Sequence, residues 1–327
     1  MKITAFEVRQ DEVEYFHQYA ETYQVEVELH SEILTPEMIS TLTYGTALSI
    51  LGQAHYGHEE LEQLAKQGVR AISLRTIGYN QIDLDAAKKL GISVCNAAYA
   101  PNGVADYTVM MILLCLRKYK QALWRMQVND YSLEGLLGRE IKDLTIGVMG
   151  TGRIGANVIQ DLSGFGCKIL AYDQHPNEKV EDLVEYVPLD TLYAQSDVIT
   201  LHMPLFPSTK HIINADSIAK MKDGVVIINC ARGALADVQA LIEGIESEKI
   251  GALGIDCIEQ EENIVHRDRR TDIFSNKDMA YLRQFKNVVY TQHMAFYTDA
   301  AVQSMVECGV RSICQMLNGE PCATRLV

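Results

Sequence analysis

Three polar residues of the kind that bind and protonate small anions stand just past apolar segments that have the composition of buried strands. They are Arg232, Glu261 and His293. In doubly wound parallel sheets, ligands bind in the crevice at the carboxyl ends of the strands. We therefore expect the three side chains to meet at one edge of a sheet.

The chemistry of these side chains is complementary. The planar guanidinium of Arg232 can bind a carboxylate through two parallel hydrogen bonds. A histidine beside a carboxylate has a raised pKa and a fixed orientation, so His293 next to Glu261 would exchange protons with a carbonyl or alcohol near neutral pH. Taken singly, each residue is better explained as structural or merely exposed, and only their joint placement beside a nucleotide fold favours an active site.

A glycine motif indicates which cofactor would accompany this acid/base. Gly150, Gly152 and Gly155 form a G-x-G-x-x-G pattern between an apolar segment, 145–149, and a helical segment, 156–162. The first glycine allows a tight turn, the second lets the backbone approach a pyrophosphate at the helix N-terminus, and the third allows close packing of helix and strand. The pattern predicts a dinucleotide site.

A second strand, Lys168-Ile-Leu-Ala-Tyr, follows the helix and ends at Asp173. A carboxylate at this place hydrogen-bonds the ribose hydroxyls and repels a 2′-phosphate, which favours NAD over NADP. The alternative is a glycine-bearing turn in an unrelated α/β protein.

Length and charge limit the class of protein. The chain has 327 residues, which is enough for two domains, and 48% hydrophobic and 22% charged residues are usual for a globular protein. The net charge of −14 argues against nucleic acid and anionic membranes as partners. An anionic substrate must therefore be held by a local positive group.

Targeting and metal signals are weak. The longest apolar run, Val109–Leu116, is far shorter than a membrane span, and the first residues lack the features of a signal peptide. The eight cysteines form no C-x-x-C and indicate buried thiols in a reducing compartment. We expect a cytoplasmic protein without a metal, since His55 and His58 have no further clustered ligands.

Strand-like and helix-like segments alternate along the chain, which predicts an α/β fold with parallel sheets. The predicted strands are 3–8, 24–29, 47–51, 71–74, 93–96, 145–149, 168–172, 198–202, 225–229, 252–256 and 288–291. The predicted helices include 12–23, 36–42, 58–67, 84–90, one long helix over 101–128, and a last helix over 298–318.

Five strands before the glycine motif are too many for one nucleotide-binding domain. We therefore predict two Rossmann-like doubly wound domains, one inserted into the other. Residues 1–100 and 297–327 would form the substrate-binding domain, and residues 101–296 the NAD-binding domain. The chain would cross between them near Pro101 and Phe296, and the domains would close over the substrate.

The whole chain resembles the D-2-hydroxyacid dehydrogenases. The matching pieces are Arg75-Thr-Ile-Gly78, Asn80-Gln-Ile-Asp83, Asn96-Ala-Ala-Tyr99-Ala-Pro101-Asn102, Val104-Ala-Asp106-Tyr107, Gly147-Val-Met-Gly-Thr-Gly-Arg-Ile-Gly155, Leu201-His202-Met203-Pro204-Leu205, Met221-Lys-Asp-Gly224, Ala231-Arg232-Gly233 and His293-Met-Ala-Phe296-Tyr297-Thr298. The family's arginine, glutamate and histidine fall on Arg232, Glu261 and His293. The resemblance implies an NAD-dependent enzyme that interconverts 2-oxo and D-2-hydroxy acids.

The resemblance also implies a set of binding residues. Those expected at the cofactor are Gly150, Gly152, Arg153, Ile154, Gly155, Asp173, Met203, Pro204, Thr209, Cys230, Ala231 and Asp256. Those expected at the substrate are Leu51, Gly52, Ile77, Gly78, Tyr99, Arg232 and Phe296, with the amides of Ile77 and Gly78 on its carboxylate. Small Gly52 beside Leu51 would leave room for more than a methyl group.

The substrate stays open at this stage. The chain is most similar to the branch with D-lactate, D-hydroxyisocaproate, glycopeptide-resistance and phenyllactate dehydrogenases, so pyruvate, branched-chain oxo acids and phenylpyruvate are all candidates. Two prolines usual in the family are replaced, by Gln292 before the histidine and by Ala98 before Tyr99. Both changes affect loop stiffness and leave the three site residues in place.

Two other functions fit the same motifs. One is an NAD-sensing binding protein like the corepressors that resemble this family, although the chain lacks long interaction tails. The other is a formate or phosphite type of NAD dehydrogenase. We also expect a homodimer joined through the nucleotide domain, because the first half of the 101–128 helix is apolar all round.

Overall fold

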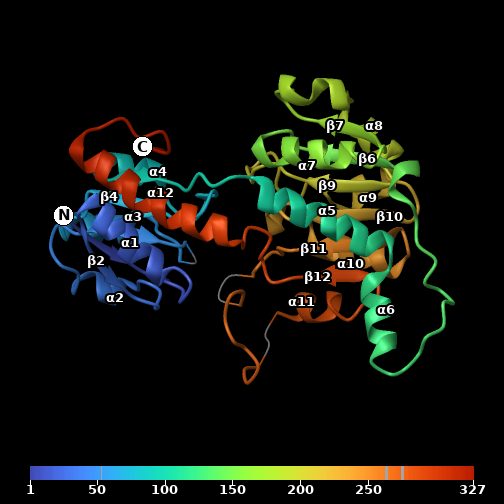
Figure 1. Cartoon of the computed structure of the whole chain (residues 1–327), viewed down its shortest axis with the longest axis horizontal. Coiled ribbons are helices and arrows are strands. Elements are labelled where there is room, and N and C mark those ends of the chain that lie inside the picture. The colour runs from blue at the N-terminus through green and yellow to red at the C-terminus, as the bar shows by residue number, and fades with distance from the viewer. Residues whose placement is uncertain (53, 262–263, 274–275) are drawn as a thin grey trace. The chain divides into compact units, whose positions relative to one another are not determined.

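The computed structural model describes residues 1–52, 54–261, 264–273 and 276–327 (Figure 1). The chain divides into two compact units. Unit 1 comprises residues 1–100 and 297–327, and unit 2 comprises residues 101–296. Each unit contains one parallel sheet covered by helices, which confirms the predicted α/β fold.

The sheet of unit 1 has five parallel strands in the order β2-β1-β3-β4-β5. Their bounds are β1 Lys2–Ala5, β2 Glu26–Leu29, β3 Ala47–Ile50, β4 Ala71–Leu74 and β5 Ser93–Cys95. All residues of β3 and β4 are buried, as expected for strands that helices cover on both faces. The strand order reverses between β1 and β3, so successive connections lead to opposite faces of the sheet.

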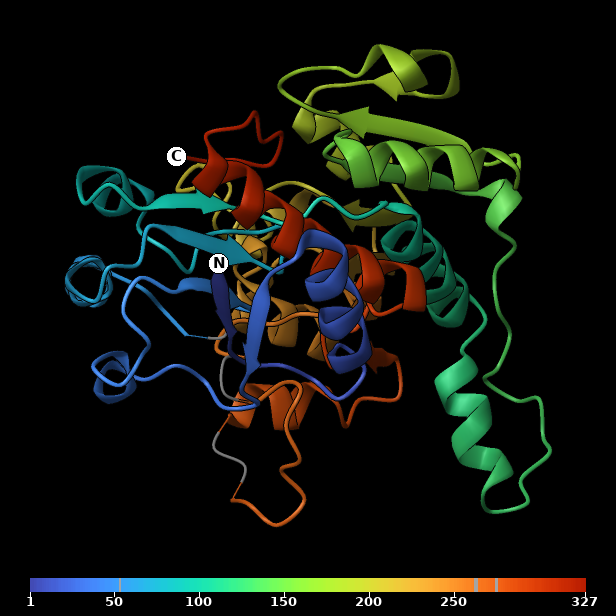
Figure 2. The same ribbon diagram turned by 60° about the vertical axis from the view of Figure 1, so that its left-hand side comes forward.

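Helices cover both faces of this sheet. Helices α1 and α12 pack together on one face, and α2, α3 and α4 lie on the other (Figure 2). Their bounds are α1 Val13–Tyr23, α2 Pro36–Ile39, α3 His58–Lys66, α4 Leu84–Lys89 and α12 Asp299–Asn318. The last helix of the chain therefore belongs to the same unit as the first strands.

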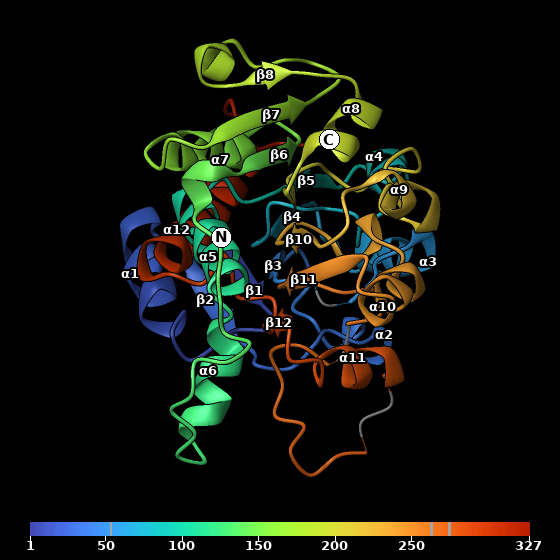
Figure 3. The ribbon, with the colours of Figure 1, turned by 90° about the vertical axis from the view of Figure 1, so that its right-hand side faces the viewer.

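The sheet of unit 2 has seven parallel strands in the order β12-β11-β10-β9-β6-β7-β8. Their bounds are β6 Thr145–Met149, β7 Lys168–Tyr172, β8 Glu185–Tyr186, β9 Val198–Leu201, β10 Val225–Asn229, β11 Ile250–Ile255 and β12 Val288–Tyr290. Helices α5 and α7 lie on one face, and α8, α9 and α10 on the other (Figure 3). Their bounds are α5 Asn102–Leu116, α7 Arg153–Ser163, α8 Leu189–Gln195, α9 Ala215–Lys220 and α10 Val238–Glu246, and α11 covers Lys277–Leu282.

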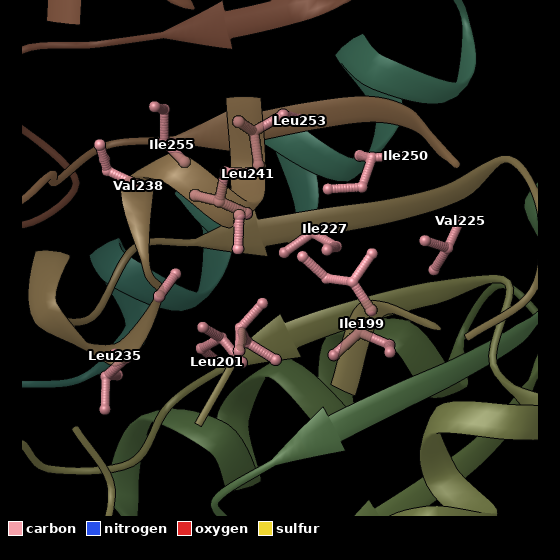
Figure 4. Packing of buried hydrophobic residues seen from close by; sticks show 14 of the residues in the cluster. Ile199, Leu201, Val225, Ile227, Leu235, Val238, Leu241, Ile250, Leu253 and Ile255 are labelled. Atoms are coloured by element: carbon pink, nitrogen blue, oxygen red, sulfur yellow. The ribbon is translucent and has the colours of Figure 1, made fainter. Parts of the chain in front are cut away.

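Apolar side chains of neighbouring strands and α10 form the main core of unit 2 (Figure 4). Ile199, Ile227 and Leu253 come from β9, β10 and β11, and Leu241 comes from α10. All are at most 2% exposed. This core fixes the strands whose ends carry the predicted site residues.

The predicted helix over 101–128 is wrong in one respect, because the chain forms two helices there. Helix α5 ends at Leu116, and α6 runs from Tyr119 to Met126. Lys118 between them adopts a left-handed backbone with φ 50°. The Leu116 carbonyl accepts the amide of Arg139 at 3.1 Å, so a contact with a later segment replaces continued helical pairing.

Several predicted strands run past the observed ends. The first was predicted to reach Val8, whereas β1 ends at Ala5 and Glu7 has a left-handed backbone with φ 57°. Within the described part of the chain, no helix is long and apolar enough to cross a membrane.

Candidate active site

His293 and Glu261 form a hydrogen-bonded pair in unit 2. His293 follows β12 and Glu261 follows β11, and the imidazole Nδ1 lies 2.6 Å from Glu261 Oε1. The other carboxylate oxygen of Glu261 accepts the amide of Ile258 at 3.0 Å, which holds the carboxylate in place. The His293 side chain is 30% exposed and that of Glu261 12%, so the imidazole is the member that a ligand can reach.

The surroundings of His293 raise its pKa above the ordinary value. Burial by itself lowers the pKa, but the hydrogen bond and charge of Glu261 and the charge of Asp256 raise it and outweigh burial. With Nδ1 occupied by Glu261, Nε2 is the ring atom that can exchange a proton with a ligand. A histidine whose pKa is raised by a carboxylate partner has the chemistry of a general acid.

Asp256 holds the loop that carries His293. Its side chain is fully buried, and one oxygen accepts the hydroxyl of Thr291 at 2.7 Å and the amide of Met294 at 2.9 Å. The other oxygen accepts the amide of Ala295 at 2.7 Å. His293 has a left-handed backbone with φ 57°, which is unfavourable for a residue with a Cβ and is maintained by these bonds.

Arg232 lies at the end of β10 and acts on the same imidazole. Its positive charge acts to lower the pKa of His293, against the larger effect of Glu261. The Asn229 side chain accepts the amide of Ala231 at 3.1 Å and donates to the Arg232 carbonyl at 2.9 Å, so the turn is fixed. A Cβ at Gly233 would collide with the backbone of Ile258, which shows how closely the turn approaches the loop leading to Glu261.

The glycine turn after β6 has the geometry of a phosphate-binding turn. Gly150 has φ 96°, which only glycine adopts readily, and a Cβ at Gly155 would collide with the Gly150 carbonyl. Gly152 precedes the first residue of α7 without a side-chain cap, and a Cβ there would meet no atom within 4 Å. The helix N-terminus is therefore open for an anionic group.

Asp173 lies just past the end of β7, next to this turn. One carboxylate oxygen accepts the amide of Thr151 at 2.6 Å, and the other accepts the amide of His175 at 2.9 Å. The first oxygen, Oδ2, also accepts the Thr151 hydroxyl at 3.2 Å, and the other, Oδ1, can accept a further hydrogen bond. The arrangement fits a dinucleotide with its pyrophosphate at α7 and its ribose at Asp173.

The other predicted cofactor residues follow the same ends of the strands. Arg153 and Ile154 begin α7, Met203 and Pro204 follow β9, and Cys230 and Ala231 follow β10. The Thr209 hydroxyl donates to the Pro204 carbonyl at 2.7 Å and so closes the loop after β9.

The predicted substrate residues are divided between the two units. Phe296 belongs to unit 2, three residues after His293. In unit 1, Leu51 and Gly52 follow β3, Ile77 and Gly78 follow β4, and Tyr99 follows β5, so all lie on the carboxyl side of the sheet. Asn96 Nδ2 donates to the Ile77 carbonyl at 2.7 Å, and the Thr76 hydroxyl donates to the Gly78 carbonyl at 2.7 Å.

The sequence interpretation missed several polar contacts around these positions. His266 Nε2 lies 2.9 Å from the His293 carbonyl oxygen, and a second histidine–carboxylate pair joins His211 and Glu259 at 2.8 Å. In unit 1, Arg75 and Glu12 form a fully buried ion pair at 2.9 Å. Among the described residues, no group of three or more potential ligands could hold a metal ion.

The chain is similar in sequence to known proteins along nearly its whole length. Residues 109–295 match the family described as D-isomer specific 2-hydroxyacid dehydrogenase, NAD binding domain. The chain is 45% identical to an aromatic 2-oxoacid reductase of Clostridium sporogenes over 94% of this chain and 93% of the relative. It is 37% identical to D-lactate dehydrogenase of Escherichia coli over the full length of both.

A solved structure supports the same relationship. The NAD complexed form of the D-isomer specific 2-hydroxyacid dehydrogenase of Lactobacillus delbrueckii ssp. bulgaricus superimposes with a TM-score of 0.84 at 30% identity, and the match covers all of both chains. With its glycine turn, its acid/base pair and this similarity along the whole sequence, the chain belongs to the D-isomer specific 2-hydroxyacid dehydrogenase family.

Proposed function

We propose that this NAD-dependent D-2-hydroxyacid dehydrogenase reduces a 2-oxo acid to the D-2-hydroxy acid with His293 as the proton donor. The observation that carries the proposal is the 2.6 Å hydrogen bond between His293 and Glu261, with the charge of Arg232 acting on the same ring. Bound NADH supplies the hydride that reduces the carbonyl carbon.

The chain's own residues would have three roles. Arg232 would hold the substrate carboxylate, together with the amides of Ile77 and Gly78. His293 would give its Nε2 proton to the carbonyl oxygen, and Glu261 would stabilise the imidazolium before the transfer. In the reverse direction, neutral His293 would take the proton of the hydroxyl group.

We propose a substrate with a branched or aromatic side chain, with pyruvate as the smaller alternative. The support is that the Clostridium sporogenes relative, 45% identical to this chain, is named an aromatic 2-oxoacid reductase. The room that the sequence predicted beside Gly52 gives no support, because the Gln81 side-chain amide occupies the place of a Cβ there. Free thiols at all eight cysteines also support our proposal of a cytoplasmic location.

The direct test is NADH oxidation with pyruvate, 2-oxoisocaproate and phenylpyruvate side by side, followed by chiral analysis of the product. We expect the D-enantiomer, and a higher kcat/KM for a bulky acid than for pyruvate. NADPH should work poorly, because Asp173 would repel its 2′-phosphate. Failure to oxidise NADH with any 2-oxo acid would refute the proposed function.

A further inference from the structure

The strand order of unit 1 identifies a position at which a ligand would bind. The order β2-β1-β3-β4-β5 reverses between β1 and β3, and doubly wound sheets bind ligands outside the carboxyl ends of the strands at this point. The residues that flank the position follow β1 and β3. They are Glu7 on one side and Leu51 and Gly52 on the other.

The side chain of Glu7 bridges this position. A single carboxylate oxygen, Oε2, accepts the amide of Leu51 and the amide of Gly52, each at 2.7 Å. Glu7 is only 6% exposed. Short hydrogen bonds to an ionised acceptor are stronger than neutral ones, so the segment after β3 is tied firmly to the end of β1.

The backbone on both sides of this bridge is held in an unusual conformation. Glu7 has φ 57° and Gly52 has φ 92°. The Glu7 amide donates to the Glu32 carbonyl at 2.9 Å, and the Glu7 carbonyl accepts Nη2 of buried Arg75 at 3.1 Å. These bonds keep a non-glycine residue left-handed, and such conformations persist where the surroundings over-determine them.

The segment 51–52 also packs against Gln81, a side chain that is hydrogen-bonded to the loop after β4. A Cβ at Gly52 would collide with the side-chain amide of Gln81. That amide donates to the Thr76 hydroxyl at 3.1 Å and to the Gly78 carbonyl at 3.3 Å. Glu7, the segment 51–52 and the loop proposed to bind the substrate carboxylate therefore form one connected set of contacts.

We propose that Glu7 is a positioning residue that sets the enzyme's selectivity for the substrate side chain by fixing Leu51 and Gly52. The inference rests on the proposed function, in which this segment surrounds that side chain. Glu7 does not touch the reacting atoms. Its loss should change which 2-oxo acid is accepted, and should leave NADH binding and the pH dependence of the rate unchanged.

The experiment compares Glu7→Ala, Glu7→Gln and a matched control, Glu32→Ala, in the full-length protein. Glu32 follows β2 at the same edge of the sheet, and its side chain is 65% exposed. For each protein, kcat and KM are measured with phenylpyruvate and pyruvate, and the NADH Kd is measured by fluorescence. Hydrogen exchange of a peptide that covers residues 51–52 reports directly on the two hydrogen bonds that Glu7 accepts from their amides.

We expect Glu7→Ala to lower the phenylpyruvate-to-pyruvate ratio of kcat/KM by roughly 5-fold or more, mainly through the KM for phenylpyruvate. Exchange at residues 51–52 should become faster, and the NADH Kd should stay within about two-fold. Glu7→Gln should restore most of the ratio, because both amides use one oxygen that glutamine retains. Glu32→Ala should behave as the wild type.

A wild-type ratio in folded Glu7→Ala would overturn the inference. Should that variant fail to fold, Glu7→Asp replaces it: the charge remains but the side chain is too short to reach both amides, so an unchanged ratio again overturns the inference. A wild type that reduces no 2-oxo acid would instead refute the proposed function and, with it, any selectivity role. An active wild type whose Glu7→Ala and Glu7→Asp variants keep the wild-type ratio refutes only the role of Glu7.

Discussion

At the scale of single residues, the partly buried carboxylate of Glu261 and the buried carboxylate of Asp256 act on His293 in different ways. Glu261 contacts the ring at Nδ1 and raises its pKa, whereas Asp256 contacts the hydroxyl of Thr291 and the backbone after His293 and fixes where the ring lies. Removing the first should therefore change proton affinity, and removing the second should change geometry. Both carboxylates raise the pKa of His293, so loss of either should shift a pH profile, but only loss of Asp256 should also displace the loop that carries the ring.

The first prediction concerns Glu261→Gln. Reduction needs protonated His293, so its rate is full below the pKa of His293 and falls as pH rises through it. Without the anionic partner that pKa falls, and the alkaline limb of kcat/KM for reduction should move to lower pH. Oxidation of the hydroxy acid needs the neutral ring, so the acid limb of its kcat/KM profile should also move to lower pH.

The matched control for this prediction is Glu259→Gln. Glu259 belongs to the same loop but pairs with His211 at 2.8 Å. Its loss should leave both limbs unchanged. Identical profiles for Glu261→Gln and the wild type would remove Glu261 from the proton transfer.

The second prediction concerns Arg232→Lys. Lysine keeps the charge but loses the planar fork that binds a carboxylate through two hydrogen bonds. We expect kcat/KM for every 2-oxo acid to fall by about 10- to 100-fold, with the NADH Kd nearly constant. Arg139→Lys, which changes an exposed arginine of the same unit, is the control. A fall of less than two-fold would assign carboxylate binding to another residue.

The sequence predicted some of these residues and missed others for a physical reason. Arg232, Glu261 and His293 could be predicted from the sequence, because each follows a recognisable apolar strand and strand ends share one edge of a sheet. The hydrogen bonds of Glu7 could not be predicted, because their donors lie 44 and 45 residues away in the sequence. These donors are the backbone amides of Leu51 and Gly52, a group that nearly every residue type carries. No residue type in the sequence marks such a contact.

At the scale of elements, the turn between β6 and α7 depends on close packing of helix and strand. Gly155 is within the first turn of α7, and the Gly150 carbonyl occupies the place that a Cβ at Gly155 would take. The steric conflict is with backbone, which cannot rotate away as a side chain can. The motif therefore needs glycine at this position for packing as well as for binding.

The third prediction compares Gly155→Ala with Gly164→Ala at the other end of α7. The first should displace the helix start, weaken NADH binding by roughly ten-fold or more, and destabilise the fold by about 1–3 kcal/mol through overpacking. At Gly164 a Cβ would meet only the Asp161 carbonyl, at 3.6 Å, and φ is −66°, so alanine should be tolerated. Thermal unfolding and NADH titration measure both. Equal effects of the two variants would contradict the packing argument.

Elements were predicted well where periodicity decides and poorly where distant contacts decide. The mostly apolar strands β4, β6, β7 and β10 have the predicted bounds, whereas the two-residue strand β8, Glu185–Tyr186, was not predicted. The break between α5 and α6 has no proline or glycine to announce it. It depends on the contact of Leu116 with Arg139, which lies outside the helical segment itself.

At the scale of the whole molecule, one segment of unit 2 carries nine exposed large apolar residues. Helices α5 and α6 and the chain that follows them carry these exposed residues: Met110, Tyr119, Leu123, Trp124, Met126, Val128, Tyr131, Leu133 and Leu137. Leu133 and Leu137 are more than 80% exposed. Exposed apolar side chains that gather into a large patch are typical of interaction sites, and this segment is where we expect one.

The last prediction is a homodimer formed through this segment. A second copy is the natural partner, because most soluble oligomers are symmetric and a two-fold contact pairs the same surface of both subunits. Multi-angle light scattering should therefore give twice the 36.6 kDa of one chain at micromolar concentration. Leu133→Asp with Leu137→Asp should lower the mass toward that of one chain, because each copy would bury two unpaired charges. Ile273→Asp is the control, since Ile273 is 97% exposed but lies outside the segment. A wild type with the mass of one chain, or a double variant that stays dimeric, would show that this surface does not join two subunits.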